Sequence, residues 1–144
     1  MYGVSGVIGV GYEGRELDEF VASLVAAGVT RVVDVRFAAR SRKRGFAKTA
    51  LAAALGAAGI AYEHQPALGN PPSNRAGFRG SEAELAAARA AYAQRLASVG
   101  APALAAVAAA ARRETVALLC FERDQHRCHR EVLLGALTAR SPSS

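Results

Sequence analysis

The sequence of 144 residues is long enough for one domain with a buried core and too short for two domains of ordinary size. Hydrophobic residues make up 51% and charged residues 21% of the chain, which excludes a disordered protein, and no uncharged apolar run is long enough to span a bilayer. Lysine and arginine outnumber aspartate and glutamate by 18 to 12, and the net charge of +6 favours anionic partners, either small molecules or nucleic acids. We expect one domain over residues 1–140, followed by a short polar tail at 141–144.

The start of the chain and its cysteine content predict a cellular compartment. The first residues lack the basic segment that begins a signal peptide. The sequence has two cysteines, Cys120 and Cys128, and a domain of this size does not need a disulfide. We therefore expect a soluble, cytoplasmic protein with reduced thiols and no membrane partner.

Strand and helix patterns alternate along the chain. Four segments have the apolar composition of buried strands: 4–10, 31–37, 60–64 and 115–119. Helical patterns follow them at 17–25, in a segment that ends near Gly59, at 85–96, at 102–113, and from Cys128 or its neighbour onward. This alternation predicts a Rossmann-like three-layer α/β sandwich, with a mostly parallel sheet of about four strands and helices on both faces.

The long segment from 65 to 81 contains three prolines and three glycines and is predicted to be a loop. Loops of this length in small domains often cover functional sites.

The order of the strands determines which loops meet. We expect the last strand beside the first, at one end of the order 60–64, 31–37, 4–10, 115–119. Open α/β sheets bind ligands at the crevice where the chain direction switches. This order brings the loops 11–15 and 120–130 to one crevice, with Asp34 and Arg36 one strand away.

Three carboxylates near strand ends are candidate general acids or bases: Glu13, Glu122 and Asp34. Glu13 lies between glycines in the turn GYEGR, where an acid has no packing role. The structural alternatives are an ion pair of Glu122 with Arg123 or Arg130, and of Asp34 with Arg36.

The two cysteines have different predicted roles. Cys128 lies at a predicted helix start among Arg127, His129 and Arg130, so its pKa should be lowered and its thiolate is a candidate nucleophile. Cys120 follows an apolar strand and is either a buried core residue or a thiol partner of Cys128. Their spacing is not one of the tight zinc spacings and does not fit haem attachment, so we predict no metal and no cofactor.

Arginines dominate the candidate ligand-binding residues. Arg15, Arg36 and Arg130 have the planar fork that grips phosphate or carboxylate. Seven basic residues and one acid lie between positions 31 and 48. Tyr12 has the ring to stack on a base or a sugar. The full predicted ligand-binding set is Tyr12, Gly14, Arg15, Arg36, Ser41, Arg44, His129 and Arg130.

Four short motifs occur in a specific order: GYEG after the first strand, DVR followed by RSRKRGF, ALG at 67–69, and the closing C-x-E with CHR. In this combination the sequence resembles the bacterial and archaeal family of the domain of unknown function 488, nearly from end to end. The family often has a proline shortly before Ser41, where this chain has Ala39. The positions that match the family motifs are Tyr12, Glu13, Gly14, Asp34, Arg36, Ser41, Cys120, Glu122, Cys128, His129 and Arg130. The resemblance implies an α/β Rossmann-like fold and no established reaction.

Three functions fit these residues. The first is an enzyme acting on a phosphate-bearing substrate, a nucleotide or nucleic acid. The alternatives are a non-catalytic nucleic-acid-binding module and a thiol-dependent transfer or redox protein. The enzyme hypothesis predicts that one cavity is surrounded by Tyr12, Glu13, Glu122, His129 and Arg130.

Overall fold

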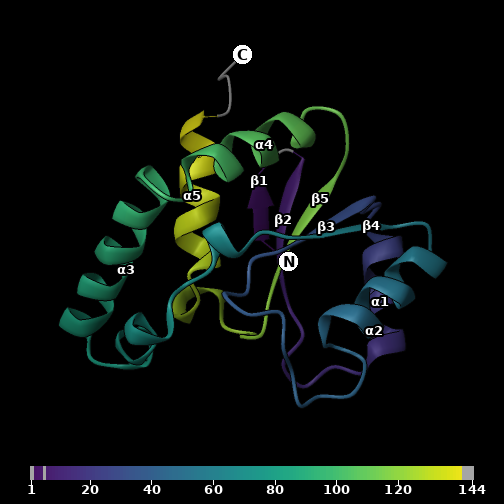
Figure 1. Ribbon diagram of the computed structural model, residues 1–144, viewed down its shortest axis with the longest axis horizontal. Coiled ribbons are helices and arrows are strands. Elements are labelled where there is room, and N and C mark those ends of the chain that lie inside the picture. The colour runs from purple at the N-terminus through teal and green to yellow at the C-terminus, as the bar shows by residue number, and fades with distance from the viewer. Residues whose placement is uncertain (1, 5, 141–144) are drawn as a thin grey trace.

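A five-stranded sheet runs through the centre of the molecule in the order β1-β2-β5-β3-β4 (Figure 1). The computed structural model describes residues 2–4 and 6–140. Its strands are β1 (Tyr2–Val4), β2 (Val7–Gly11), β3 (Arg31–Asp34), β4 (Ala61–His64) and β5 (Val116–Cys120). β2, β5, β3 and β4 are parallel, whereas β1 pairs with β2 in the antiparallel direction. The predicted, mostly parallel sheet is confirmed, with one additional edge strand.

Helices cover both faces of this sheet (Figure 1). The helices α1 (Leu17–Ala26) and α2 (Lys48–Ala57) lie on one side. On the other side lie α4 (Ala101–Ala111) and α5 (Arg130–Arg140), and α3 (Glu82–Ala97) packs against α5. The Rossmann-like α/β sandwich is therefore confirmed. No helix in the described part of the chain is both long and apolar enough to cross a membrane.

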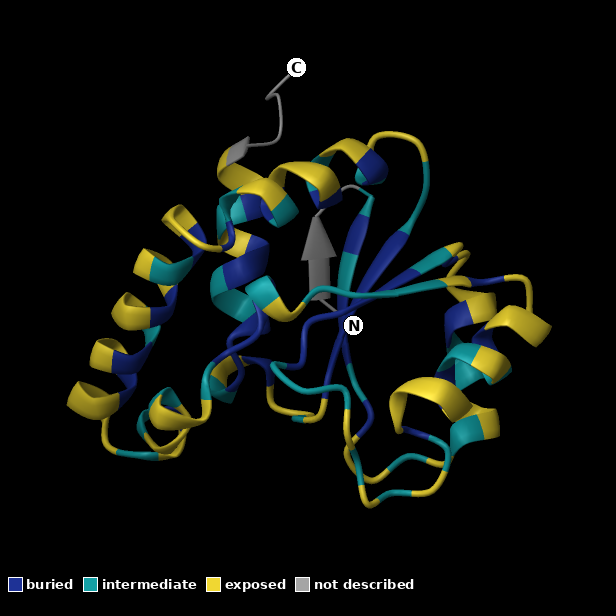
Figure 2. Cartoon of the chain, viewed as in Figure 1, coloured by how far each residue is buried: buried dark blue, intermediate teal, exposed yellow. Residues whose placement is uncertain are grey.

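The central strand β5 joins two hydrophobic cores, because neighbouring side chains of a strand point to opposite faces. Val116 and Leu118 pack in the core under α3, α4 and α5. Ala117 and Leu119 pack in the core under α1 and α2. Figure 2 shows the buried residues on the strands and on the inner sides of the helices. All five residues of β5 are buried, so the loop that follows it begins at a fixed point in the core.

The predicted strand order is wrong in one respect. It placed the last strand outside the first, but β5 lies between β2 and β3 and pairs with both. An uninterrupted apolar strand is typical of a strand buried on both faces, and the centre of the sheet provides that burial. The expected contact between the first and last strands is nevertheless present, because β2 pairs with β5.

Segment 4–10 forms parts of two strands rather than one. β1 and β2 are joined by a turn in which Gly6 has a φ of 83°, a conformation that residues with a Cβ rarely adopt. The predicted loop 65–81 contains three short 3-10 turns, at Pro66–Leu68, Pro72–Asn74 and Ala76–Arg79. The predicted polar tail at 141–144 lies outside the described residues.

Candidate functional site

A cavity of about 340 Å³ lies where the loops after β2, β3 and β5 meet the segment from Asn70 to Arg79. This is the carboxyl edge of the parallel strands, where α/β sheets commonly bind ligands. One part of its wall carries ionisable groups that are buried or half-buried: Cys120, Glu122, Cys128 and His129. Six arginines also line the cavity: Arg36, Arg40, Arg42, Arg75, Arg79 and Arg127.

The charge of the cavity lining is strongly positive. Arg40, Arg42, Arg75 and Arg79 are exposed, and none of them forms an ion pair with another described residue. Among the described lining residues, Glu122 is the single acid. Arginine clusters of this kind bind phosphate and carboxylate groups through paired N–H donors.

Arg127 connects two walls of the cavity. Its Nη1 donates to the carbonyl oxygens of Gly80, at 2.9 Å, and Phe78, at 3.4 Å. These hydrogen bonds join the loop after β5 to the 3-10 turn that carries Arg79. The loop that was predicted to cover a site therefore forms one side of the cavity.

The thiol groups and the imidazole meet at the buried end of the cavity. The Nε2 atom of His129 lies 2.7 Å from the carbonyl oxygen of Val35. Because a carbonyl oxygen only accepts, Nε2 carries the proton, and the lone pair of the neutral ring is on Nδ1. This Nδ1 lies 3.9 Å from the Cys120 Sγ and 3.7 Å from the Cys128 Sγ.

Cys120 also contacts the single acid of the cavity, since its Sγ donates to the Glu122 Oε2 at 3.0 Å. The neighbouring Cys128, His129 and Arg130 side chains lower the pKa of Cys120. Burial and the adjacent Cys120 raise the pKa of Glu122 to about 7. The pKa values of this thiol and this carboxyl thus move toward each other, which favours sharing of a proton between them.

The predicted direction of the Cys128 pKa is wrong. Burial and the neighbouring Cys120 raise the pKa of Cys128. The residue has an extended backbone, with φ −128° and ψ 147°, and α5 begins two residues later at Arg130. Cys128 is therefore not inside the first helical turn, and the directions of the two pKa shifts favour the protonated form of Cys128 over that of Cys120.

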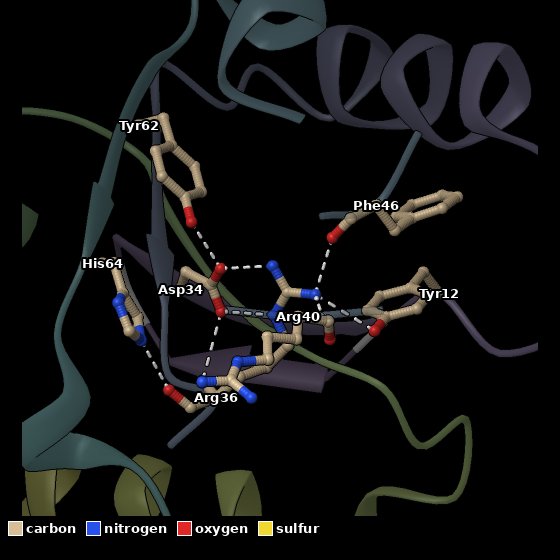
Figure 3. A network of polar contacts seen from close by, with 7 residues as sticks. All are labelled: Tyr12, Asp34, Arg36, Arg40, Phe46, Tyr62 and His64. Atoms are coloured by element: carbon tan, nitrogen blue, oxygen red, sulfur yellow. Dashed lines mark hydrogen bonds and ion pairs between the residues drawn. The ribbon is translucent and has the colours of Figure 1, made fainter. Parts of the chain in front are cut away.

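Asp34 and Arg36 form a buried ion pair (Figure 3). The Arg36 Nε donates to the Asp34 Oδ1 at 2.8 Å, and its Nη2 donates to Oδ2 at 2.6 Å. The Tyr62 hydroxyl donates to the same Oδ2 at 2.5 Å. Burial and this bond raise the pKa of Tyr62. Both Asp34 oxygens have donors, which favours the ion-pair alternative over general-base chemistry at this residue.

The remaining donors of Arg36 fasten the loop after β3. Its Nη1 donates to the carbonyl oxygens of Phe46, at 2.6 Å, and Arg40, at 3.3 Å, and to the Tyr12 hydroxyl at 3.2 Å (Figure 3). Arg36 lines the cavity, but these bonds make it a support for the loop more than a ligand donor. The Tyr12 ring is 2% exposed and stacks on Phe46 with centroids 4.4 Å apart. The expectation that Tyr12 stacks on a ligand is therefore corrected, because both the ring and its hydroxyl have protein partners.

Six predicted site residues do not line this cavity: Glu13, Gly14, Arg15, Asp34, Arg44 and Arg130. Glu13 is exposed and accepts a hydrogen bond from the backbone N–H of Arg123 at 2.9 Å. A second hollow, of about 470 Å³, is lined by Gly14, Arg15 and Arg130 among others. Arg130 is buried, and its Nη1 donates to the carbonyl oxygen of Val10 at 3.1 Å.

The prediction of one cavity for five residues is thus wrong for two of them. Tyr12, Glu122 and His129 line the same cavity, whereas Glu13 and Arg130 do not. The backbone N–H groups of Tyr12 and Glu13 both donate to the end of β5 and the residue after it, at the carbonyl oxygens of Cys120 and Phe121. Glu13 lies in the turn after β2, and its carboxylate bonds to the Arg123 backbone N–H outside the cavity lining.

Two further predicted residues lie in the basic loop. Ser41 lines the cavity, and its Oγ accepts a hydrogen bond from the backbone N–H of Lys43 at 3.0 Å. Arg44 is exposed and is not among the residues that line the cavity.

Sequence reasoning missed three cavity arginines, Arg75, Arg79 and Arg127. The first two belong to the segment that was expected to cover a site, so its two arginines were an available signal. Phe121 was also missed; it lines the cavity and is 44% exposed, as one of three exposed large apolar side chains in the described part of the chain.

Comparison with known families identifies the chain. The model of a domain of unknown function, DUF488, matches residues 16–137. The protein belongs to the DUF488 family. The matched range includes Asp34, Arg36 and Ser41 and also the CFE and CHR motifs. It begins just after the turn GYEGR. The resemblance inferred from the sequence motifs is confirmed. Neither the curated proteins nor the solved structures contain a match to this DUF488 chain.

The buried ion pair between Asp34 and Arg36 should contribute strongly to the free energy of unfolding of this DUF488 domain. We expect Asp34→Asn to lower the free energy of unfolding by about 3–5 kcal/mol, because it leaves the buried Arg36 without its counter-charge. Tyr62→Phe removes one hydrogen bond to a charged group and should cost about 1.5 kcal/mol. Urea denaturation measures both, with the exposed Asp18→Asn as the control. A loss for Asp34→Asn no larger than that of the control would refute a structural role for the pair.

Proposed function

We propose that this protein is an enzyme that binds a phosphate-bearing small molecule, such as a nucleotide, in the arginine-lined cavity and acts on it at the Cys120, Glu122 and His129 side chains. The observation that carries this proposal is that one cavity combines six arginines with a buried cluster of acid, thiol and imidazole groups. A site with convergent polar groups at the carboxyl edge of a parallel sheet is the usual place for catalysis in this fold class.

The cavity has the size and charge for such a ligand. Its volume of about 340 Å³ falls in the range of small-molecule sites. The exposed arginines come from two separate segments, Arg40 and Arg42 after β3, and Arg75 and Arg79 before α3, so they approach a bound anion from different sides. Phosphate oxygens accept the paired donors of a guanidinium group better than those of an ammonium group.

Phe121 extends the proposal from phosphate to nucleotide. Its exposed ring lines the same cavity as the arginines and directly precedes Glu122. Exposed aromatic rings beside a basic surface stack on bases or sugars. A ligand with both a phosphate and a planar base would contact the arginines and this ring together.

Glu122 is placed to move a proton during the reaction. It is the single acid among the described residues that line the cavity, and its Oε2 contacts the Cys120 Sγ. A carboxyl group held at the wall of a substrate cavity is the common form of a general acid or base. Glu13 and Asp34 have protein partners instead, so we assign no proton transfer to them.

The binding part of the proposal predicts a ligand-dependent gain in thermal stability. Inorganic phosphate, pyrophosphate and nucleoside phosphates should raise the melting temperature by mass action, by an amount equivalent to about 2.7 kcal/mol at a hundredfold excess over Kd. Arg79→Gln should weaken binding about tenfold, because a hydrogen bond to a charged group contributes about 1.5 kcal/mol. Arg112→Gln is the matched control, since Arg112 is exposed and lies outside the cavity lining. Equal effects of the two substitutions would contradict this site.

The catalytic part predicts a separation of binding from turnover. Phosphate-bearing compounds that bind should be consumed by the wild-type protein, as followed by phosphorus NMR and mass spectrometry. Glu122→Gln keeps the shape of the side chain and should retain binding while lowering kcat by about 100-fold or more. Full turnover by Glu122→Gln would remove the assigned role. Binding without any conversion of the bound compounds by the wild-type protein would contradict the enzyme proposal.

One observation favours a second function, a non-catalytic nucleic-acid-binding module. Arg40, Arg42, Arg44 and Lys48 are all exposed along one basic segment. Such a segment follows a nucleic-acid backbone, and its affinity falls steeply as salt rises. Salt-dependent binding of a single-stranded oligonucleotide that is weakened by Arg44→Gln and unchanged by Glu122→Gln would support this module, because Arg44 lies outside the cavity lining.

A further inference from the structure

Three potential metal ligands converge at the buried end of the cavity. The Sγ atoms of Cys120 and Cys128 and a ring nitrogen of His129 all lie within 4.8 Å of one another. We propose that these three side chains bind one thiophilic divalent metal ion, with Zn²⁺ as the chemical type, and leave a coordination position directed toward the cavity. This inference stands on the coordination geometry and goes beyond the proposed substrate binding.

The distances suit a tetrahedral ion. Zn–S bonds of about 2.3 Å and Zn–N bonds of about 2.0 Å at tetrahedral angles separate sulfur from nitrogen by about 3.5 Å. In the structure the His129 Nδ1 lies 3.9 Å from the Cys120 Sγ and 3.7 Å from the Cys128 Sγ. Movements of a few tenths of an ångström therefore bring the nitrogen and each sulfur to the separation of two ligands of one ion. The two sulfurs, which lie within 4.8 Å of each other, must approach to about 3.8 Å.

The second ring nitrogen of His129 already has the partner that metal-binding histidines require. Its Nε2 donates to the carbonyl oxygen of Val35 at 2.7 Å, which fixes the tautomer with a free lone pair on Nδ1. The Tyr92 ring packs edge-on against the imidazole, with centroids 5.0 Å apart. The lone pair is thus held in the direction of the two thiols before any ion arrives.

The sulfur ligands have comparable support. The backbone N–H of Arg130 donates to the Cys128 Sγ at 3.5 Å, a contact that stabilises a thiolate. Metal binding leaves the net charge of the site unchanged, because one divalent ion replaces the two thiol protons, which pass to solvent. The resulting ion with two thiolates and one neutral imidazole is neutral overall, which suits a site among buried residues.

The fourth position distinguishes this site from a structural zinc site. All three ligands line the cavity, as does Glu122, whose Oε2 lies 3.0 Å from the Cys120 Sγ. Two cysteines and one histidine with an open position form a known type of catalytic zinc site, in which water or substrate completes the coordination. The long spacing between Cys120 and Cys128 argued against a metal from sequence alone, but the strand end and the segment before α5 bring them together.

Metal binding is tested on the purified, reduced, full-length protein with Zn²⁺ and with Co²⁺ as a spectroscopic probe. We expect one equivalent of zinc to remain after desalting. Cobalt should give the charge-transfer absorption of cobalt–thiolate bonds together with the visible bands of tetrahedral cobalt. Cys128→Ser and His129→Gln should each weaken binding by about 100-fold or more, since changes in the supporting shell alone cost about 10- to 100-fold. His126→Gln is the matched control, because His126 is exposed and lies outside the cluster.

A second measurement avoids any substitution. In the unchanged protein, one equivalent of Zn²⁺ should protect both thiols from a thiol-specific reagent. Absence of the cobalt–thiolate absorption with both thiols reduced, or equal affinity of Cys128→Ser and the wild-type protein, would overturn the metal site. Formation of a Cys120–Cys128 disulfide in place of metal binding would overturn it and favour the thiol redox function. Phosphate binding that depends on Arg79 is measured separately, so failure of one proposal does not hide failure of the other.

Discussion

The ion pair between Asp34 and Arg36 supports two parts of the candidate site: the arginine-bearing loop after β3, and the cluster of the two thiols and the imidazole. Through Arg36 it holds the carbonyl oxygens of Arg40 and Phe46 and the Tyr12 hydroxyl, and so fixes the loop after β3. Between the paired residues lies Val35, whose carbonyl oxygen accepts the hydrogen bond from the His129 Nε2. The last residue of β3 and the two residues after it therefore position the arginine-bearing loop and orient the imidazole of the thiol cluster. Loss of the ion pair would disturb both.

The central position of β5 explains why distant parts of the chain contribute to one cavity. β5 lies between β2 and β3, so the loop after it, from Phe121 to His129, reaches the cavity together with the loops of both neighbours. The last residue of β5, Cys120, lines the cavity, and so does Cys128, which lies just before α5. The segment before α3 then adds arginines from the other side. The site combines a rigid, buried end with an exposed basic rim, which suits chemistry at one end of an anion-binding cavity.

Local patterns in the sequence were enough for the helices, the parallel strands and the family, because strand and helix periodicities are properties of short segments. They missed the antiparallel edge strand β1, which the prediction merged with β2. They were not enough for the strand order, since the decisive fact was which apolar strand is buried on both faces, and β5 is fully apolar whereas β2 contains glycines. The proton distribution of the thiols also escaped prediction. It depends on Cys120 meeting Cys128, Glu122 and His129 in space, not on the charges beside Cys128 in the chain.

The central claim is that the arginines and the thiol cluster form one ligand site. A titration of the ¹⁵N-labelled protein with pyrophosphate, followed by the backbone amide signals in NMR spectra, tests it most directly. The account predicts that the amides of Arg79 and of Cys120, Glu122 and His129 shift together with one apparent Kd, while that of Arg112 does not move. Shifts confined to the exposed basic segment at residues 40–48, with the signals of Cys120, Glu122 and His129 unchanged, would contradict it.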